Sequence, residues 1–194
     1  MFSGIVEATG MVVGLETKRQ QRVLTIRKPS GWKFREGESV SVEGVCSTVQ
    51  QTKRGTFQVT YMPETLRKST LGSLRLHDEV NLERSLTLNT LIGGHLVQGH
   101  VDTTGRIRKI KPEGEAKIYT FDAPARFARY IVPKGSIAVD GISLTVVNPR
   151  RNTFEVSLLA YTLSHTTLGK KGVGDRVNIE VDMLAKYIER LLGK

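Results

Sequence analysis

The sequence is poor in residues that build disulfides, cysteine metal sites and stacking surfaces. It has a single cysteine, Cys46, which excludes an internal disulfide framework and any zinc or iron–sulfur site made of several cysteines. Aromatic residues make up only 6 % of the 194 residues, so few side chains are available to stack on nucleic-acid bases. The shortage of cysteine is typical of a protein in a reducing compartment.

Long apolar runs are also missing. No stretch approaches the roughly 18 to 20 apolar residues that cross a bilayer. The first residues, MFSGIVEATG, lack the basic start and the long apolar run of a signal peptide. We therefore expect a soluble, cytoplasmic protein that has no membrane partner.

Several well-known catalytic motifs are absent. The sequence has no G-x-G-x-x-G, G-x-x-x-x-G-K-[ST], H-E-x-x-H or G-x-S-x-G, which argues against nucleotide-driven and zinc-hydrolase enzymes. The net charge of +10 invites a nucleic-acid interpretation, but the Lys and Arg residues are scattered, mostly in pairs beside turn residues. We expect no nucleic-acid partner and keep a nucleic-acid-binding protein as an alternative.

What the sequence does contain is an internal repeat. Residues 39–83 align without a gap with residues 136–180, and residues 4–12 align with residues 99–107. Many aligned residues are identical, and among them Gly44 corresponds to Gly141, Asn81 to Asn178 and Glu83 to Glu180. The repeat predicts two homologous domains, 1–92 and 93–182, followed by a C-terminal segment, 183–194.

Each copy has the pattern of β-structure. VSV at 40–42, FQVTY at 57–61 and VNLE at 80–83 alternate apolar and polar residues, as do their counterparts in the second copy. Many short strands in under a hundred residues favour a small barrel or sandwich. Gly44 and Gly141 interrupt strands and indicate a bulge or a close backbone approach. Gly72 and Gly169 are predicted to end a helical turn in the left-handed conformation.

An amphipathic helix is predicted after the second copy. In DMLAKYIERLLGK the apolar residues recur every three or four positions, at Leu184, Tyr187, Ile188, Leu191 and Leu192. A helix of about three turns is too short to be stable alone. It must pack either on the barrel or on the same helix of other subunits.

Two matching segments are candidates for ligand binding. GVCST at 44–48 and GISLT at 141–145 place Cys46 with Thr48, and Ser143 with Thr145, on one face of a strand. These side chains are either polar members of the core or the lining of a cleft. Because the segment is duplicated, we infer that one type of molecule is bound twice, and two bound copies that react would gain from facing each other.

Four further residues have chemical and structural interpretations. His100 stands where the first copy has Ile5, and its imidazole suits proton transfer near neutral pH. His95 either acts chemically or fixes the linker, and Asp182 is either catalytic or a helix N-cap. Cys46 is either a nucleophile or a small buried thiol.

The motifs together resemble a known family over essentially the whole chain. They are MFSGIVE, GESVSVEGVCSTV, MPETLRKSTLG, VNLERSL, GGHLVQGHVD, KGSIAVDGISLTV, TTLG and VNIEVDMLAKYIERLL, and they are similar to the riboflavin synthase family of the α-subunit type. The resemblance implies an all-β fold of two tandem six-stranded Greek-key barrels and a C-terminal α-helix that assembles a homotrimer. The resemblance also points to lumazine synthase as a protein partner.

The resemblance implies a reaction and a set of site residues. Two molecules of 6,7-dimethyl-8-ribityllumazine would exchange a four-carbon unit to give riboflavin and 5-amino-6-ribitylamino-uracil, with no metal or other cofactor. The implied catalytic residues are Phe2, Ser39, Cys46, His100, Thr145 and Asp182. The implied N-terminal pocket contains Gly4, Ile5, Val6, Cys46, Ser47, Thr48, Met62, Glu64 and Thr65. The implied C-terminal pocket contains Gly99, His100, Val101, Lys134, Ser143, Leu144, Thr145, Leu159 and Thr162.

Two segments depart from the family pattern. Ser47 stands where the family usually has leucine, and LLAYT at 158–162 lacks the usual Ile-Pro, so that Ala160 and Tyr161 alter the second pocket. The alternative function is a non-catalytic lumazine- or flavin-binding protein of the antenna type, which keeps one competent pocket. The altered LLAYT segment favours this alternative, whereas His100 and the intact GISLT favour the enzyme.

Overall fold

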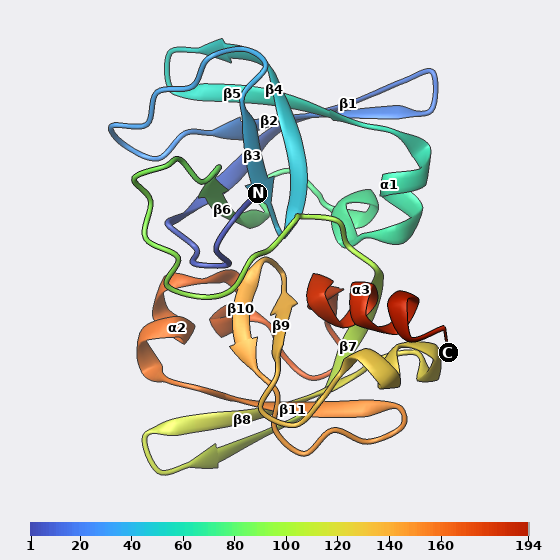
Figure 1. Cartoon of the computed structure of the whole chain (residues 1–194). Coiled ribbons are helices and arrows are strands. Elements are labelled where there is room, and N and C mark those ends of the chain that lie inside the picture. Colours follow the sequence, from blue (N-terminus) through green and yellow to red (C-terminus); the bar gives the residue numbers. More distant parts are fainter. Residues whose placement is uncertain (194) are drawn as a thin grey trace.

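The first repeat forms a closed β-barrel. The computed structural model describes residues 1–193, and the two repeats lie one above the other (Figure 1). The barrel order is β1-β2-β5-β4-β3-β6, in which β6 returns between β3 and β1 as a Greek key requires. Its strands are β1 (Ala8–Lys18), β2 (Gln21–Arg27), β3 (Ser39–Val42), β4 (Val45–Lys53), β5 (Thr56–Tyr61) and β6 (Glu79–Arg84).

The second repeat has the same six strands but is not fully closed. Its order is β10-β9-β12-β7-β8-β11. Two residues beyond the end of β10, Val147 forms an isolated bridge with Glu155 of β11. The predicted fold of two six-stranded repeats is confirmed, and in the second repeat this single bridge lies next to Asn148, which has a left-handed φ of 46°. The strands are β7 (Thr103–Glu113), β8 (Ala116–Asp122), β9 (Ser136–Val139), β10 (Ile142–Thr145), β11 (Thr153–Leu158) and β12 (Arg176–Val181).

Each repeat has its own apolar core, as the alternating pattern predicts. In β5 the side chains of Phe57, Val59 and Tyr61 point inward and are buried, while Gln58 and Thr60 between them are half-exposed. Each fully buried apolar side chain of this size contributes about 1.5 to 3 kcal/mol to folding. The fold therefore follows from the period-two pattern in both copies.

The two repeats meet at a pair of tight turns, which we call the junction turns, Glu43–Gly44 and Asp140–Gly141. Both residues of each turn have positive φ, as a two-residue type I′ hairpin requires. A Cβ on Gly44 would lie 2.5 Å from the backbone nitrogen of Gly141. The predicted close backbone approach is confirmed, and it occurs in a hairpin turn and not in a bulge.

Hydrogen bonds across the junction follow the internal symmetry. Asn81 accepts from the N–H of Thr167 at 2.8 Å, and Asn178 accepts from the N–H of Thr70 at 2.7 Å. The Asn81 amide also donates to the carbonyl of Asp140, as the Asn178 amide donates to that of Glu43. These buried amides satisfy backbone groups of the opposite repeat, so buried hydrogen bonds join the two repeats directly.

The start of each repeat lies against the other repeat. Ser143 N–H donates to the carbonyl of Gly4 at 2.7 Å, and Cys46 N–H donates to the carbonyl of Gly99 at 2.8 Å. Phe2 and the linker residue Val97 form an antiparallel bridge between these two segments. The repeats therefore exchange their first residues, a feature that we call the exchanged starts.

Helical segments follow the fifth strand of each repeat. They are α1 (Pro63–Lys68), η1 (Thr70–Ser73), α2 (Ala160–His165) and η3 (Thr167–Lys170), with η2 (Ala125–Tyr130) after β8. The prediction that Gly72 and Gly169 take a left-handed conformation is wrong. They lie within η1 and η3, where a Cβ would come within 2.6 Å of the Leu66 carbonyl oxygen and 1.8 Å of that of Leu163.

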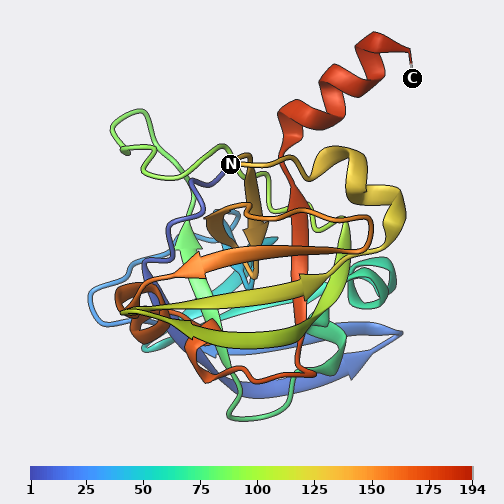
Figure 2. The ribbon, with the colours of Figure 1, turned by 90° about the horizontal axis from the view of Figure 1, so that it is seen from below.

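The predicted C-terminal helix is confirmed as α3 (Met183–Leu192). The Asp182 carboxylate accepts from the N–H of Leu184 at 2.9 Å and caps the helix. In Figure 2 the helix projects from the body of the molecule, and its apolar residues Tyr187, Ile188 and Leu191 are exposed. Among residues 1–193, none of the helices has the length and apolar character that a membrane crossing requires.

Candidate functional site

The first candidate pocket is formed by both repeats. It has a volume of about 210 Å³ and lies between the start of β4, the helix α1 and the segment 99–101. Cys46, Glu64 and Thr65 line it from the first repeat, and His100 and Val101 from the second. His100 is exposed and Cys46 is half-buried, so both are accessible to a ligand in the pocket.

Backbone geometry fixes the position of His100. Gly99 has a φ of +79°, and a Cβ at this residue would lie 2.6 Å from the Cys46 nitrogen. The buried Glu180 carboxylate accepts from the N–H groups of Gln98 at 2.8 Å and Gly99 at 2.9 Å. Burial raises the pKa of Glu180, although these two N–H donors stabilise the ionised form. His100 therefore follows a segment held on both sides.

The second candidate site is related to the first by the internal symmetry. Gly4, with a φ of +75°, approaches Ser143 as Gly99 approaches Cys46. Glu83 accepts from the N–H groups of Ser3 at 2.6 Å and Gly4 at 3.1 Å, in the role that Glu180 has in the first pocket. Burial raises the pKa of Glu83 as well. The equivalent of His100 here is Ile5, which is exposed.

A histidine from the linker occupies the second site. His95 Nδ1 lies 2.7 Å from the hydroxyl oxygen of Ser143. Burial lowers the pKa of His95, and the nearby charge of Asp182 opposes this shift. The sequence left His95 with two interpretations, a chemical role and a role in fixing the linker. Its place in the GGH motif, in front of the second copy, was the signal that could have pointed to the site.

Other predicted site residues lie at the ends of the same strands. Ser39 is the cross-strand partner of Thr48, and in the second repeat Thr145 is the partner of Ser136. A cavity of about 550 Å³ beside α3 is lined by both Ser136 and Asp182. The predicted catalytic residues are thus divided. Cys46 and His100 line the first pocket, whereas Phe2, Ser39, Thr145 and Asp182 do not.

Four predicted binding residues are placed around the second site. Leu144 is half-buried and packs on the second core, Thr162 is half-buried and Leu159 is exposed. Lys134 is exposed and has a φ of +61°, which is the region that favours glycine, and its counterpart in the first repeat is Gly37. Near the first pocket, Met62 is exposed just before α1.

Two predicted site residues are buried away from the pockets. Ser47 points into the first core, where its hydroxyl lies 2.7 Å from that of Tyr61. Burial raises the pKa of Tyr61. Phe2 has no exposed surface and packs with Val97, Ala138 and Cys46. Phe2 is therefore not accessible to a ligand in either pocket. The Ser47 side chain faces the core because alternation along β4 turns Cys46 and Thr48 the other way.

The predicted grouping of the pockets is corrected by the exchanged starts. Gly4, Ile5 and Val6 were expected in the N-terminal pocket, but Gly4 lies on Ser143 and Val6 packs on the second core. Gly99, His100 and Val101 were expected in the C-terminal pocket, but they line the pocket of Cys46. The reason is that each start crosses the junction. The roles of all these residues in binding or catalysis stay predictions.

Among residues 1–193, no group of three or more His, Cys, Asp or Glu side chains is arranged to hold a metal ion. Comparison with known proteins adds the family. The model of the lumazine binding domain family matches residues 3–85 and again residues 98–182. Riboflavin synthase of Mycobacterium tuberculosis (strain ATCC 25618 / H37Rv) is 49 % identical over 201 residues, which cover 99 % of this chain and 98 % of that protein. This chain belongs to the riboflavin synthase family.

Relatives of the family are found well beyond mycobacteria. Riboflavin synthase of Schizosaccharomyces pombe (strain 972 / ATCC 24843) is 43 % identical over 99 % of this chain and 94 % of its own length. Riboflavin synthase of Bacillus subtilis (strain 168) is 38 % identical over 100 % and 91 %. The family model matches two segments whose bounds differ from those predicted for the domains. The division of the chain into 1–92, 93–182 and 183–194 therefore stays a prediction.

Solved structures agree with the fold. The structure of LumP complexed with riboflavin has a TM-score of 0.86 at 20 % identity and covers 94 % of this chain and 100 % of its own. LumP complexed with 6,7-dimethyl-8-(1'-D-ribityl) lumazine has a TM-score of 0.83 at 19 % identity, with 93 % and 99 % covered. At this identity the likeness shows that this chain and LumP share a fold.

Proposed function

We propose that this protein is a riboflavin synthase, a transferase that converts two molecules of 6,7-dimethyl-8-ribityllumazine into riboflavin and 5-amino-6-ribitylamino-uracil. The observation that carries the proposal is the pair of equivalent sites built on a chain that matches riboflavin synthases over its whole length. A cytoplasmic location is part of the proposal, and the free thiol of Cys46 is compatible with a reducing compartment.

His100 is the proposed proton carrier. The reaction requires removal of a proton from the 7-methyl group of one lumazine, and a positioned imidazole typically accelerates such a transfer by about 10² to 10⁴. His100 is accessible in the first pocket and held there by Gly99. Thr145 and Asp182 lie near the second site, so one pocket alone does not contain all the proposed groups.

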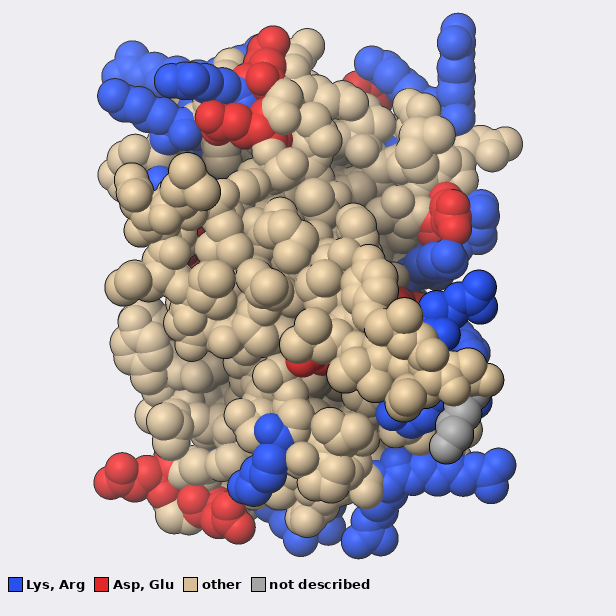
Figure 3. All heavy atoms as spheres, in the orientation of Figure 1, with Lys and Arg blue, Asp and Glu red and all other residues tan. Residues whose placement is uncertain are grey.

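This division supports a reaction between subunits. We propose that the first pocket of one subunit faces the second site of its neighbour in a homotrimer. Helix α3 and the linker segment that follows β6 lie at the same end of the molecule (Figure 2), and both carry exposed apolar residues, which in the linker are Leu88 and Leu91. The centre of the face in Figure 3 is almost free of Lys, Arg, Asp and Glu, as a subunit interface favours. An association with lumazine synthase is a further proposal, which cosedimentation of the two proteins tests.

The assembly can be tested by a charge on α3. Ile188→Lys should shift the protein from trimer to monomer in sedimentation velocity and lower its riboflavin synthase activity by the same fraction. Lys186→Arg keeps the charge on the same helix and should leave the trimer intact. A monomeric variant that keeps full specific activity would contradict the proposed reaction between subunits.

The main experiment is an incubation of the purified protein with 6,7-dimethyl-8-ribityllumazine. The enzyme should produce riboflavin over many turnovers. A non-catalytic antenna-type protein would bind the lumazine and return it unchanged, and the exposed Tyr161 at the second site is the observation that favours this second candidate. A well-folded trimer that gives no riboflavin would reject the enzyme.

A variant of His100 separates chemistry from binding. His100→Ile installs the residue of the equivalent position in the second site, and it should lower kcat about 10²-fold or more while lumazine binding changes much less. His77→Asn removes another exposed histidine, which lies in a turn of the first repeat, and should leave both quantities unchanged. Equal losses in turnover and in binding would reject the assignment of His100 as proton carrier.

A further inference from the structure

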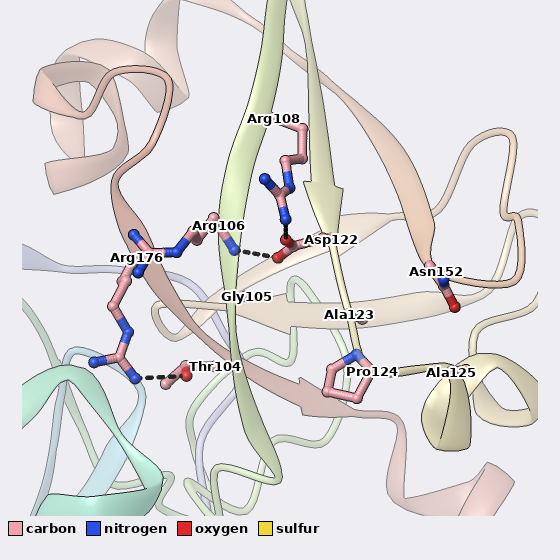
Figure 4. A pocket seen from close by; sticks show the side chains of 10 residues that line it. All are labelled: Thr104, Gly105, Arg106, Arg108, Asp122, Ala123, Pro124, Ala125, Asn152 and Arg176. Atoms are coloured by element: carbon pink, nitrogen blue, oxygen red, sulfur yellow. Dashed lines mark hydrogen bonds and ion pairs between the residues drawn. The ribbon is translucent and has the colours of Figure 1, made fainter.

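A cavity on the second repeat is lined by three arginines. It has a volume of about 610 Å³ and lies beside β7, the end of β8 and the start of β12 (Figure 4). Arg106 and Arg108 come from β7 and Arg176 from β12. None of the residues that line this cavity lines the first candidate pocket. The arginines are therefore not explained by the proposed reaction.

Two of these arginines occupy an unfavourable arrangement. Arg106 and Arg176 are direct cross-strand partners in the antiparallel pair of β7 and β12. Like charges placed directly opposite each other destabilise a sheet. The equivalent partners in the first repeat are Met11 and Glu79, so the fold itself does not require arginine at either position. A counter-charge between the strands would remove this repulsion.

The protein supplies only part of that counter-charge. The Asp122 carboxylate pairs with Arg108 at 2.5 Å and accepts from the backbone N–H of Arg106 at 2.5 Å. The guanidinium groups of Arg106 and Arg176 donate to neutral acceptors, the Gly174 carbonyl and the Thr104 hydroxyl, each at 2.8 Å. Within residues 1–193 neither forms an ion pair. Three arginines and one carboxylate leave a formal charge of +2 around the cavity.

We propose that this cavity binds a phosphate monoester of a small molecule. A phosphate monoester carries a charge of about −1.5 to −2 near neutral pH, which matches the charge left around the cavity. The planar fork of arginine fits phosphate oxygens, and two guanidinium groups on facing strands can hold one phosphate between them. A volume of about 610 Å³ is within the usual range of small-molecule sites. All three arginines line one cavity, with Arg106 and Arg176 on one side of β7 and Arg108 on the other (Figure 4), whereas a nucleic acid favours a long basic stripe.

The probe for this site is phenyl phosphate, titrated at low ionic strength by isothermal calorimetry, with phenol as the uncharged reference. Arg106→Met with Arg176→Glu installs the residues of the first repeat and should weaken binding at least tenfold. Lys53→Met with Arg54→Glu makes the same change of net charge on an exposed turn of the first repeat and should change the affinity much less. Arg176→Gln alone should weaken binding at least threefold, which keeps the test valid if the double variant fails to fold.

Three results would overturn the proposal. Equal losses in the two double variants would mean that binding follows net charge alone. Equal affinity for phenol would show that the phosphate is not recognised. Tighter binding of a short RNA, lost in Arg176→Gln, would assign the arginines to a nucleic acid. The residues that line this cavity are not among the proposed catalytic residues, so the variants should form riboflavin at the wild-type rate. Phosphate binding is measured separately, so its result stands even if the wild-type protein forms no riboflavin.

Discussion

Lys171 is the residue whose loss should weaken the junction most. Its ammonium group lies 2.9 Å from Glu43 and 2.5 Å from Asp140, one carboxylate from each junction turn. Both carboxylates are almost fully buried, with side-chain exposures of 3 % and 0 %, and Lys171 itself is 20 % exposed. Removal of one partner from a buried ionic group typically costs about 3 to 5 kcal/mol, because it leaves the remaining charge without compensation.

Lys171→Leu installs the residue of the equivalent position in the first repeat, Leu74. We expect the free energy of unfolding to fall by about 3 to 5 kcal/mol at pH 8, which is roughly 10 °C in Tm for a chain of this size. The neighbouring Lys170 is exposed and pairs with Glu79 on the surface, so Lys170→Leu should cost less than about 1 kcal/mol. Urea unfolding of the two variants makes the comparison.

The same variant has a predictable pH dependence. Burial, together with the charge of Glu43, raises the pKa of Asp140 from its ordinary 3.8 to about 7 even with Lys171 present. A carboxyl with a raised pKa in the folded state contributes stability below pH 4 that is lost as the pH rises towards 7. Without Lys171 the pKa rises further, so the defect should be larger at pH 8 than at pH 4. An unfolding free energy within about 1 kcal/mol of the wild-type value at pH 8 would refute this reasoning.

Three further predictions concern packing and protonation. Gly44→Ala should cost well over 2 kcal/mol in urea unfolding because the Cβ meets the opposite turn, whereas Gly55→Ala, with φ +80° and open space, should cost only about 1 to 2 kcal/mol. Equal costs would contradict the close approach. Ser47→Ala should cost about 1 to 3 kcal/mol by leaving the buried hydroxyl of Tyr61 unpaired, and adding Tyr61→Phe should restore most of it. Because burial lowers the pKa of His95, wild-type Tm should fall more than that of His95→Gln as the pH drops below about 6.5, and parallel curves would exclude this effect.

The strands and the duplication could be predicted because their signals are local. Alternation in FQVTY places Phe57, Val59 and Tyr61 on one face whatever lies around them. The same alternation, applied strictly to VCST, would have turned Ser47 inward between Cys46 and Thr48. The resemblance to the family placed Ser47 in the pocket instead, and the period of the strand was the better guide.

The contacts of the junction could not be predicted, because their partners are distant in the sequence. Lys171 reaches Asp140 over 31 residues and Glu43 over 128, and in the sequence it is one of two adjacent lysines beside a turn. Burial of a lysine is favourable only once both carboxylates are in place. No local pattern carries that information. The same is true of Gly4 and Gly99, whose need for glycine arises from a backbone in the other repeat.

The exchanged starts explain how two nearly equivalent sites become chemically different. The first pocket receives His100 from the start of the second repeat, where the second site receives Ile5. The second site gains its imidazole from another source, because the linker brings His95 against Ser143. His100 is exposed, whereas His95 is half-buried and burial lowers its pKa, so the two imidazoles differ in accessibility. The chemical difference between the two sites therefore follows from the way in which the chain connects the repeats.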